Sequence, residues 1–207
     1  SFLCTRVKQP DTDDYQKLAR VIRYLRRTKS LRLTLEASRL DQVDWYVDES
    51  FAVHEDMRSH TGVYMTMGKG GIIGGSTKQK INTTSSTEAE LVGVHDGMAS
   101  ILWVLYFLEA QGYPVKPVTI HQDNMSTMLL ANNGRASSSK RTRHINIRYF
   151  FITDRIGRRE VAVKYCPTDD MIADFYTKPL NGGKFRKFRN LIMNCDNDDG
   201  DISTSVR

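Results

Sequence analysis

Apolar and polar positions in the first forty residues predict a helix followed by a short strand. Within residues 10–28, apolar side chains recur three and four positions apart, which predicts an amphipathic helix whose start is signalled by Pro10 and Asp11. The opposite face carries Lys and Arg side chains, which fit either a solvated surface or a contact with nucleic acid. Residues 31–35 alternate between leucine and polar side chains, which predicts a strand.

The next part of the chain has the pattern of an antiparallel hairpin. Residues 43–53 are strand-like, with apolar side chains at alternate positions. Residues 62–67 and 72–73 flank the glycine-rich turn 68–71, and this succession of strand, glycine turn and strand predicts a hairpin.

A long helical pattern then begins at Ser85 and ends before Gly112 and Pro114. Downstream, the pattern predicts a strand at 118–120, helices at 124–130 and 139–157, and a strand at 161–165. A helix should then start at 167–170, with Thr168 as its N-cap. An amphipathic stretch at 185–193 and a disordered polar tail from 194 complete the prediction. This order predicts an α/β fold on a mixed sheet, in which an antiparallel meander is followed by parallel strands reached through helical crossovers.

The composition is that of a soluble protein with a basic surface. The 207 residues include 30 Lys and Arg against 24 Asp and Glu, which gives a net charge of +6 and favours a polyanionic partner. Cys4, Cys166 and Cys195 lie far apart, so neither a disulfide framework nor a zinc ribbon is indicated and a reducing, intracellular setting is expected. No apolar run approaches the ~18 residues that span a membrane, so we expect no membrane partner.

Acidic side chains recur close to the predicted strands. Asp48 lies in the first core strand, Asp123 follows the strand at 118–120, and Asp174 lies about a turn and a half into a predicted helix. Each has a purely structural alternative: an outward-facing exposed acid for Asp48, a helix N-cap for Asp123, and a solvated helical acid for Asp174.

Two further acids compete at the start of the long helix. Ser85 and Glu88 have the spacing of a capping box, and Thr87 and Glu90 repeat it in a shifted register. We assign Glu88 to the cap and Glu90 to a functional site, with the reverse assignment as the alternative. Taken together, Asp48, Glu90, Asp123 and Asp174 can converge on one point, where carboxylates suit hard divalent cations such as Mg²⁺.

Short motifs around these acids resemble one known family, the ribonuclease H domain of copia-type (Pseudoviridae-like) LTR retrotransposon polyproteins. The motifs that carry the resemblance are Tyr46-Val47-Asp48-Glu49-Ser50, His54-x-Asp56-Met57-Arg58-Ser59-His60-Thr61-Gly62, Lys78-Gln79-Lys80, Ser85-Ser86-Thr87-Glu88-Ala89-Glu90, Gln122-Asp123-Asn124, Lys140-Arg141-Thr142-Arg143-His144-Ile145 and Ala173-Asp174-Phe175-Tyr176-Thr177-Lys178-Pro179-Leu180. Residues 1–38 are similar to the end of the reverse transcriptase of such a polyprotein.

The resemblance implies a ribonuclease H-like fold, with a mixed five-stranded sheet and helices on both faces. It implies three parts: a C-terminal remnant of the reverse transcriptase at 1–40, a ribonuclease H domain at 41–180, and a basic helix with a disordered acidic tail at 181–207. It also implies that Asp48, Glu90, Asp123 and Asp174 are catalytic and bind two Mg²⁺ ions, with Mn²⁺ as a substitute, for hydrolysis of the RNA strand of RNA–DNA hybrids.

The implied partners are the RNA–DNA hybrid and the upstream reverse transcriptase domain, and the implied locations are a cytoplasmic virus-like particle and the nucleus. Candidate substrate contacts are Ser50, Gln122, Asn124, Lys78, Lys80, Lys140, Arg141, Arg143 and His144. Many ribonuclease H relatives carry a His after the last strand, and residues 165–170 contain none. The alternatives are a non-catalytic nucleic-acid-binding or scaffold domain of this fold and a DNA-cutting, integrase-like enzyme. An integrase-like enzyme usually has three acids in the order Asp-Asp-Glu, whereas the order here is Asp-Glu-Asp-Asp.

Overall fold

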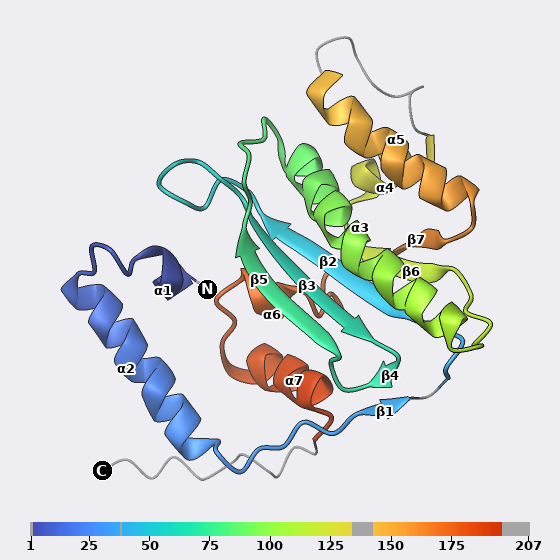
Figure 1. Cartoon of the computed structure of the whole chain (residues 1–207). Coiled ribbons are helices and arrows are strands. Elements are labelled where there is room, and N and C mark those ends of the chain that lie inside the picture. Colours follow the sequence, from blue (N-terminus) through green and yellow to red (C-terminus); the bar gives the residue numbers. More distant parts are fainter. Residues whose placement is uncertain (1, 38, 134–142, 196–207) are drawn as a thin grey trace.

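A mixed five-stranded sheet forms the centre of the computed structural model, which describes residues 2–37, 39–133 and 143–195 (Figure 1). Its strands are β2 (Asp44–Ser50), β3 (His60–Thr66), β5 (Ile73–Lys78), β6 (Val118–Gln122) and β7 (Val161–Tyr165). They lie in the order β5-β3-β2-β6-β7. β3 runs antiparallel to β2 and β5, whereas β6 is parallel to both β2 and β7. The predicted meander and parallel crossovers are therefore confirmed.

One face of the sheet is covered by α3 (Ser86–Ala110), with α4 (Met125–Asn133) and α5 (Arg143–Gly157) packed beside it. The core lies between α3 and the sheet, where Trp45 and Val47 of β2 meet Leu91, Met98 and Ile101. Gly97 permits this packing, because a Cβ atom there would come within 2.9 Å of the Trp45 ring. α3 is apolar and long enough to cross a membrane, and one of its faces is buried in this core, as expected of the central helix of a domain; Trp103, Tyr106 and Phe107 near its C-terminal end are 45–65% exposed.

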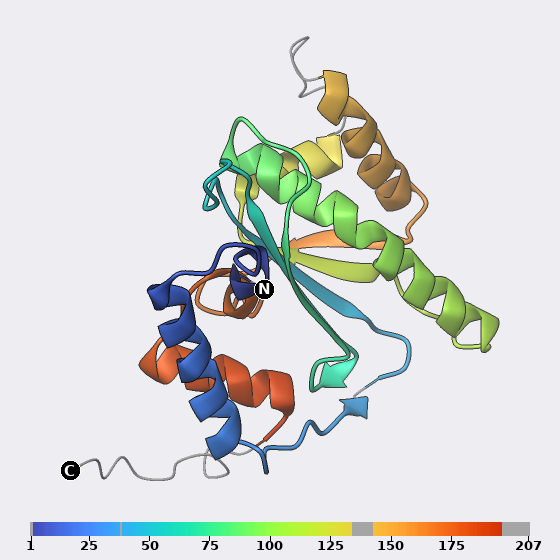
Figure 2. The same cartoon turned by 60° about the vertical axis from the view of Figure 1, so that its left-hand side comes forward.

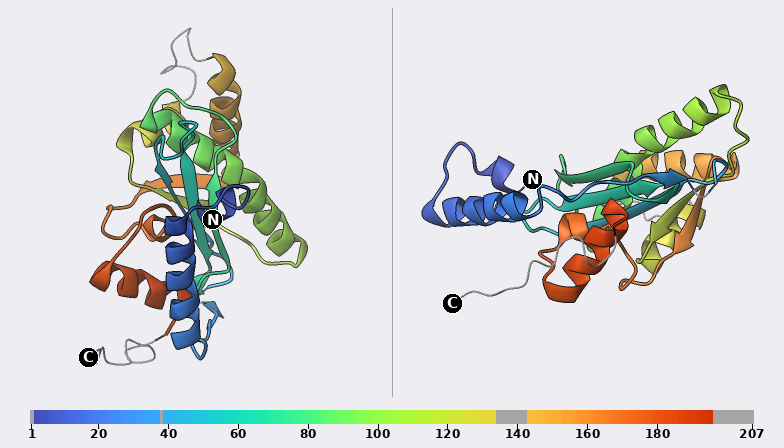
Figure 3. Two further views of the ribbon diagram at one scale, coloured as in Figure 1. Left: turned by 90° about the vertical axis from the view of Figure 1, so that its left-hand side faces the viewer. Right: turned by 90° about the horizontal axis from the view of Figure 1, so that it is seen from below.

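The other face of the sheet carries α6 (Asp174–Thr177) and α7 (Gly182–Met193), so helices lie on both faces (Figure 3, right). Phe188 of α7 is fully buried and forms a second apolar cluster with Tyr64 of β3 and Ile172. This smaller layer positions the loop that leads from β7 to Asp174.

The N-terminal helices lie outside both layers. α1 (Phe2–Thr5) precedes α2 (Thr12–Arg27), which stands beside the body in Figures 1 and 2. Asp11 caps α2 by accepting a hydrogen bond from the Asp14 N–H, as its position in the sequence predicts. Five apolar side chains on α2 remain 44–64% exposed: Tyr15, Leu18, Val21, Ile22 and Leu25.

Two predicted elements are wrong. Residues 31–35 form no strand; the short strand β1 (Glu36–Ala37) follows them and pairs with β4 (Gly68–Lys69) inside the predicted glycine turn. Residues 167–170 form a turn and not a helix start, closed by a hydrogen bond from the Asp170 N–H to the Pro167 carbonyl. The helix begins at Asp174 instead, with Ala173 at the N-cap. Asp174 is thus in the first turn and not a turn and a half into a helix.

Candidate metal centre

Three of the four predicted carboxylates converge at one edge of the sheet. Asp48, Glu90 and Asp123 each offer an oxygen, and these three oxygens lie within 4.8 Å of one another. Because β2 and β6 are parallel, Asp48 near the end of β2 and Asp123 just after β6 emerge at the same edge. Glu90 reaches this point from the second turn of α3. Asp48 and Glu90 are buried, at 1% and 5% exposure, and Asp123 is partly exposed.

The start of α3 separates the roles of Glu88 and Glu90. Ser85 is the N-cap and accepts a hydrogen bond from the Glu88 N–H. The Glu88 carboxylate accepts hydrogen bonds from the N–H and hydroxyl of Thr84, one residue before the cap position that the capping-box pattern predicts. Glu90 instead accepts a 2.6 Å hydrogen bond from the buried amide of Gln122. Glu88 therefore holds the helix start, while Glu90 belongs to the carboxylate cluster.

Asp123 is not the cap of the helix that follows it. The Asn124 side chain accepts hydrogen bonds from the N–H groups of Ser126 and Thr127, and so fulfils that role for α4. The Asp123 carboxylate accepts a hydrogen bond from the Thr168 hydroxyl, at 3.1 Å. The turn at 167–170, which sequence reasoning misassigned, thus helps to orient an acid of the cluster.

Asp174 lies outside the group of three and is tied to it through a lysine. Its buried carboxylate pairs with Lys178 Nζ at 2.6 Å and Lys184 Nζ at 3.1 Å. The Lys178 ammonium also lies 3.2 Å from Asp48, whose other oxygen accepts a hydrogen bond from the Thr177 hydroxyl. The spacing of acids could not reveal Lys178, Lys184 and Thr177, although two of them stand in the motif around Asp174.

Burial gives the cluster unusual protonation behaviour. It raises the pKa of Asp48 to about 6 and the pKa of Glu90 well above its usual range, and neighbouring carboxylates add to both shifts. Burial also raises the pKa of Glu49 to about 8, and the charge of Asp48 contributes. One oxygen of Glu49 has no hydrogen-bond partner in the described part of the chain. The Lys178 ammonium opposes the shift at Asp48 but does not cancel it. Several carboxylate oxygens gathered at one point are the kind of ligand set that a hard divalent cation prefers.

The predicted substrate contacts divide into three groups. Ser50 donates a hydrogen bond to the Thr177 carbonyl at the edge of the site, and Lys78 pairs with Asp56 while Lys80 is exposed. Gln122 is fully buried against Glu90 and the Asn124 side chain caps α4, so both side chains hold other groups of the protein, and their contact with substrate stays a prediction. Lys140 and Arg141 lie outside the described residues, as do the side chains of Arg143 and His144 at the start of α5.

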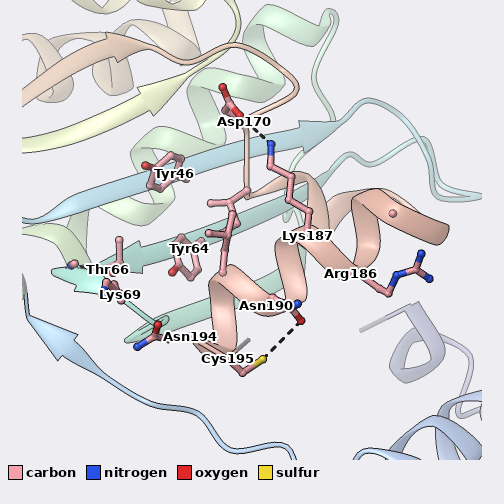
Figure 4. Close-up of a pocket in the computed structure, with 14 residues that line it drawn as sticks. Tyr46, Tyr64, Thr66, Lys69, Asp170, Arg186, Lys187, Asn190, Asn194 and Cys195 are labelled. Carbon is pink, nitrogen blue, oxygen red and sulfur yellow. Dashed lines mark hydrogen bonds and ion pairs between the residues drawn. The ribbon is translucent and has the colours of Figure 1, made fainter. Parts of the chain in front are cut away.

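A cavity of about 660 Å³ lies between the sheet and α7 (Figure 4). Tyr46 and Tyr64 line it from the sheet, and Lys187 of α7 pairs with Asp170 at its edge. None of the four predicted acids lines this cavity. The candidate metal centre therefore lies at the ends of β2 and β6 and is not part of this cavity.

Comparison with known proteins finds relatives over nearly the whole chain, although no protein-family model matches it. The retrovirus-related Pol polyprotein of transposon RE1 from Arabidopsis thaliana is 30% identical over 198 residues, which cover 93% of this chain and 13% of the relative. That of transposon TNT 1-94 from Nicotiana tabacum is 28% identical over 188 residues, covering 90% of this chain and 14% of the relative. The chain thus spans about one seventh of these relatives.

Two solved structures are similar at low identity. A ribonuclease H1 isolated from compost has a TM-score of 0.45 at 12% identity, covering 62% of this chain and 86% of its own. The N-terminal ribonuclease H domain of a Mycobacterium tuberculosis protein has a TM-score of 0.46 at 8% identity, covering 66% of this chain and 90% of its own.

Proposed function

We propose that this chain is the ribonuclease H unit of a retrovirus-related Pol polyprotein of a copia-type transposon, an endoribonuclease that hydrolyses the RNA strand of RNA–DNA hybrids. Its similarity to the Pol polyproteins of transposons RE1 and TNT 1-94 supports this origin. The observation that carries the proposal is the convergence of Asp48, Glu90 and Asp123 at the carboxyl ends of two parallel strands. Divalent ions bound there, Mg²⁺ or Mn²⁺, would activate water and stabilise the leaving oxygen of a phosphodiester.

The surrounding side chains support this role by fixing each acid separately. The Gln122 amide holds Glu90, the Thr168 hydroxyl holds Asp123, and the Thr177 hydroxyl holds Asp48. Such hydrogen bonds orient carboxylate ligands and tune their basicity, so the geometry is set before an ion or substrate arrives. Asp174 completes the proposed set of four acids from the opposite face of the sheet, through its link to Asp48 by Lys178.

We further propose the division of the chain that the family resemblance implies. Residues 1–40 are the end of a reverse transcriptase, residues 41–180 the ribonuclease H domain, and residues 181–207 a basic helix with a tail. The position of α1 and α2 outside both layers supports the first boundary. The upstream reverse transcriptase domain is then the covalent partner, and the RNA–DNA hybrid is the substrate.

Cleavage of a labelled RNA–DNA hybrid in Mg²⁺ tests the activity. We expect the wild-type chain to cut the RNA strand, and Asp48→Asn, Asp123→Asn and Glu90→Gln to lose about 100-fold or more, because each removes an anionic ligand. Glu88→Gln is the matched control, since it makes the same chemical change two residues away in the helix cap. It should cost stability of about 0.5–2 kcal/mol and leave cleavage largely intact.

Two results would contradict the proposal: no cleavage by the wild-type chain, tested also within the longer polyprotein, or equal cleavage by the variants. Binding of the hybrid without cleavage in both settings would favour the non-catalytic scaffold alternative. Loss of cleavage with Glu88→Gln but not with Glu90→Gln would reverse the assignment of the two acids.

A further inference from the structure

A single ammonium group bridges two of the proposed ligands. Lys178 Nζ lies 3.2 Å from Asp48 Oδ1 and 2.6 Å from Asp174 Oδ1. The two aspartate side chains are only 2% and 1% exposed, and they come from opposite elements, β2 and α6. One cation therefore lies between two buried anions that come from different elements.

The position of the Lys178 ammonium reduces the electrostatic repulsion between the two carboxylates in the ion-free protein. Buried carboxylates that share a site repel one another, and leaving them without a counter-charge is costly. The Lys178 ammonium neutralises part of this charge and donates hydrogen bonds to both acids. Of the two buried aspartates, Lys184 contacts Asp174 alone, at its other oxygen; its further partners include Asp169 and the Thr168 carbonyl, so it does not bridge the pair.

The bridging position is also one that a divalent ion needs. Mg²⁺ binds carboxylate oxygens at about 2.0–2.1 Å in near-octahedral geometry, whereas the ammonium holds the same two oxygens by hydrogen bonds of 2.6 and 3.2 Å. An ion between Asp48 and Asp174 and the ammonium at its present position exclude each other, both by space and by like-charge repulsion.

We propose that Lys178 is an internal counter-cation, which holds Asp48 and Asp174 together in the ion-free protein and is displaced when a divalent ion binds between them. Lys178 is suited to this exchange because its side chain is 38% exposed and sits at the C-terminal end of α6 on a flexible four-carbon stem. The two aspartates stay in place, since Thr177 holds Asp48 and Lys184 holds Asp174. Divalent-ion affinity is then set partly by competition with Lys178.

This inference rests on the proposed function, and it is tested by ion binding and stability rather than by cleavage. Lys178→Met removes the ammonium and keeps most of the apolar stem. Lys187→Met is the matched control, because it makes the same chemical change on α7, where Lys187 pairs with the exposed Asp170. Calorimetric titration with Mg²⁺ and thermal melting in chelator are measured for each.

We expect Lys178→Met to bind Mg²⁺ about tenfold more tightly than the wild-type chain, which corresponds to about 1.4 kcal/mol. In chelator its melting temperature should fall by several degrees, because the two acids lose their shared cation, and Mg²⁺ should restore more stability to it than to the wild type. Lys187→Met should match the wild type in both measurements. Lys178→Arg, which keeps the charge, should retain the ion-free stability.

Several outcomes would overturn the inference. The inference is wrong if Lys178→Met binds Mg²⁺ as tightly as the wild type or less tightly. It is also wrong if the melting temperature of Lys178→Met in chelator equals that of the wild type. Weaker binding of a non-cleavable hybrid with unchanged Mg²⁺ affinity would assign Lys178 to the substrate instead. If Lys178→Met does not fold, Lys178→Gln, which still donates a hydrogen bond to Asp174, takes its place. Failure of the wild-type chain to bind Mg²⁺ at all would count against the proposed function itself.

Discussion

Glu49 is the residue whose surroundings differ most from what the sequence indicates. Adjacent residues of a strand point to opposite faces, so a site that uses Asp48 gives no reason to expect its neighbour nearby. Yet Glu49 is 7% exposed, one of its oxygens lacks a hydrogen-bond partner in the described part of the chain, and its charge acts on Glu90. This acid should therefore destabilise the ion-free protein when it ionises.

The sign of the effect follows from the pKa of Glu49. Burial raises this pKa to about 8 in the folded chain, above its usual value of 4.5, so the folded chain holds a proton that the unfolded chain releases. The resulting stability is fully present below about pH 4.5 and is lost as the pH rises through about 8. We expect Glu49→Gln to be more stable than the wild type at pH 8 by roughly 4 kcal/mol, and to differ little near pH 4.5.

Urea denaturation in chelator at several pH values checks this prediction. Glu109→Gln is a suitable control, because Glu109 is exposed at the far end of α3 and its substitution should leave the pH profile unchanged. An identical fall in stability between pH 5 and pH 8 for the wild type and Glu49→Gln would show that Glu49 ionises freely.

At the site, the sequence indicated candidate acids but not their partners. Asp48 and Asp123 were proposed because they lie at or near strand ends, Asp174 because it lies on a helix after the last strand, and Glu90 because Glu88 explained the cap. Lys178 could not be selected, because its bridging role depends on β2 and α6 meeting across the sheet, a contact between residues 130 positions apart. Residue types indicate which ligands exist, and tertiary contacts decide which counter-charges reach them.

At the scale of elements, the close approach of α6 to β3 holds the two halves of the site together. Gly62 pairs with Asp48 across the β2–β3 ladder. A Cβ atom at Gly62 would lie 2.8 Å from the Ala173 carbonyl oxygen and 2.7 Å from the Thr177 side chain. The absence of a side chain at this position thus lets α6 bring Asp174 and Lys178 up to Asp48.

Gly62→Ala should push α6 away from the sheet. The added methyl group meets backbone and not only a flexible side-chain end, so we expect a loss of about 1–3 kcal/mol in the free energy of unfolding. Mg²⁺ affinity should fall as well, because Asp174 moves relative to Asp48. Urea denaturation and calorimetric titration measure the two effects. Gly157→Ala is the control, since nothing lies within 4 Å of a Cβ atom there and neither quantity should change appreciably. If Gly62→Ala has the free energy of unfolding and the Mg²⁺ affinity of the wild type, the close approach of α6 does not depend on a glycine at this position.

Elements with a repeating apolar pattern were predictable, and elements set by single contacts were not. The strand at 161–165 and the start of α3 at Ser85 agree with the structure, because periodicity and capping are local signals. Residues 31–35 alternate like a strand but find no partner strand; the Thr34 N–H bonds instead to the Met193 carbonyl at the end of α7. At 167–170, acids near a Pro suggested a helix start, whereas the Thr168 hydroxyl donates a hydrogen bond to the Asp123 carboxylate.

At the scale of the whole molecule, the chain divides into a layered body and an N-terminal arm. Contacts of the arm, α1 and α2, with the body include an exposed ion pair of Arg6 with Glu55 at 2.9 Å and an edge-on contact of Tyr24 with Phe185. The body itself begins before residue 41, because Thr34 and β1 already pair with it. The folded body therefore includes the last residues of the segment that we propose to come from the reverse transcriptase.

Removal of residues 1–30 should leave the body folded. An exposed ion pair contributes about 0–1 kcal/mol and an aromatic pair about 0.5–1.5 kcal/mol, so we expect a total loss of roughly 1–2 kcal/mol in the free energy of unfolding. The fragment should also bind less of a hydrophobic dye than the full chain, since it lacks the apolar face of α2 that is 44–64% exposed. Urea denaturation and dye fluorescence measure these effects, with Mg²⁺ titration to confirm that the carboxylate cluster is intact.

A fragment that fails to fold, or whose Mg²⁺ affinity is lost, would show that the arm is part of the ribonuclease H domain. A fragment with wild-type Mg²⁺ affinity would instead place the independent folding unit, and with it the candidate metal centre, within residues 31–207.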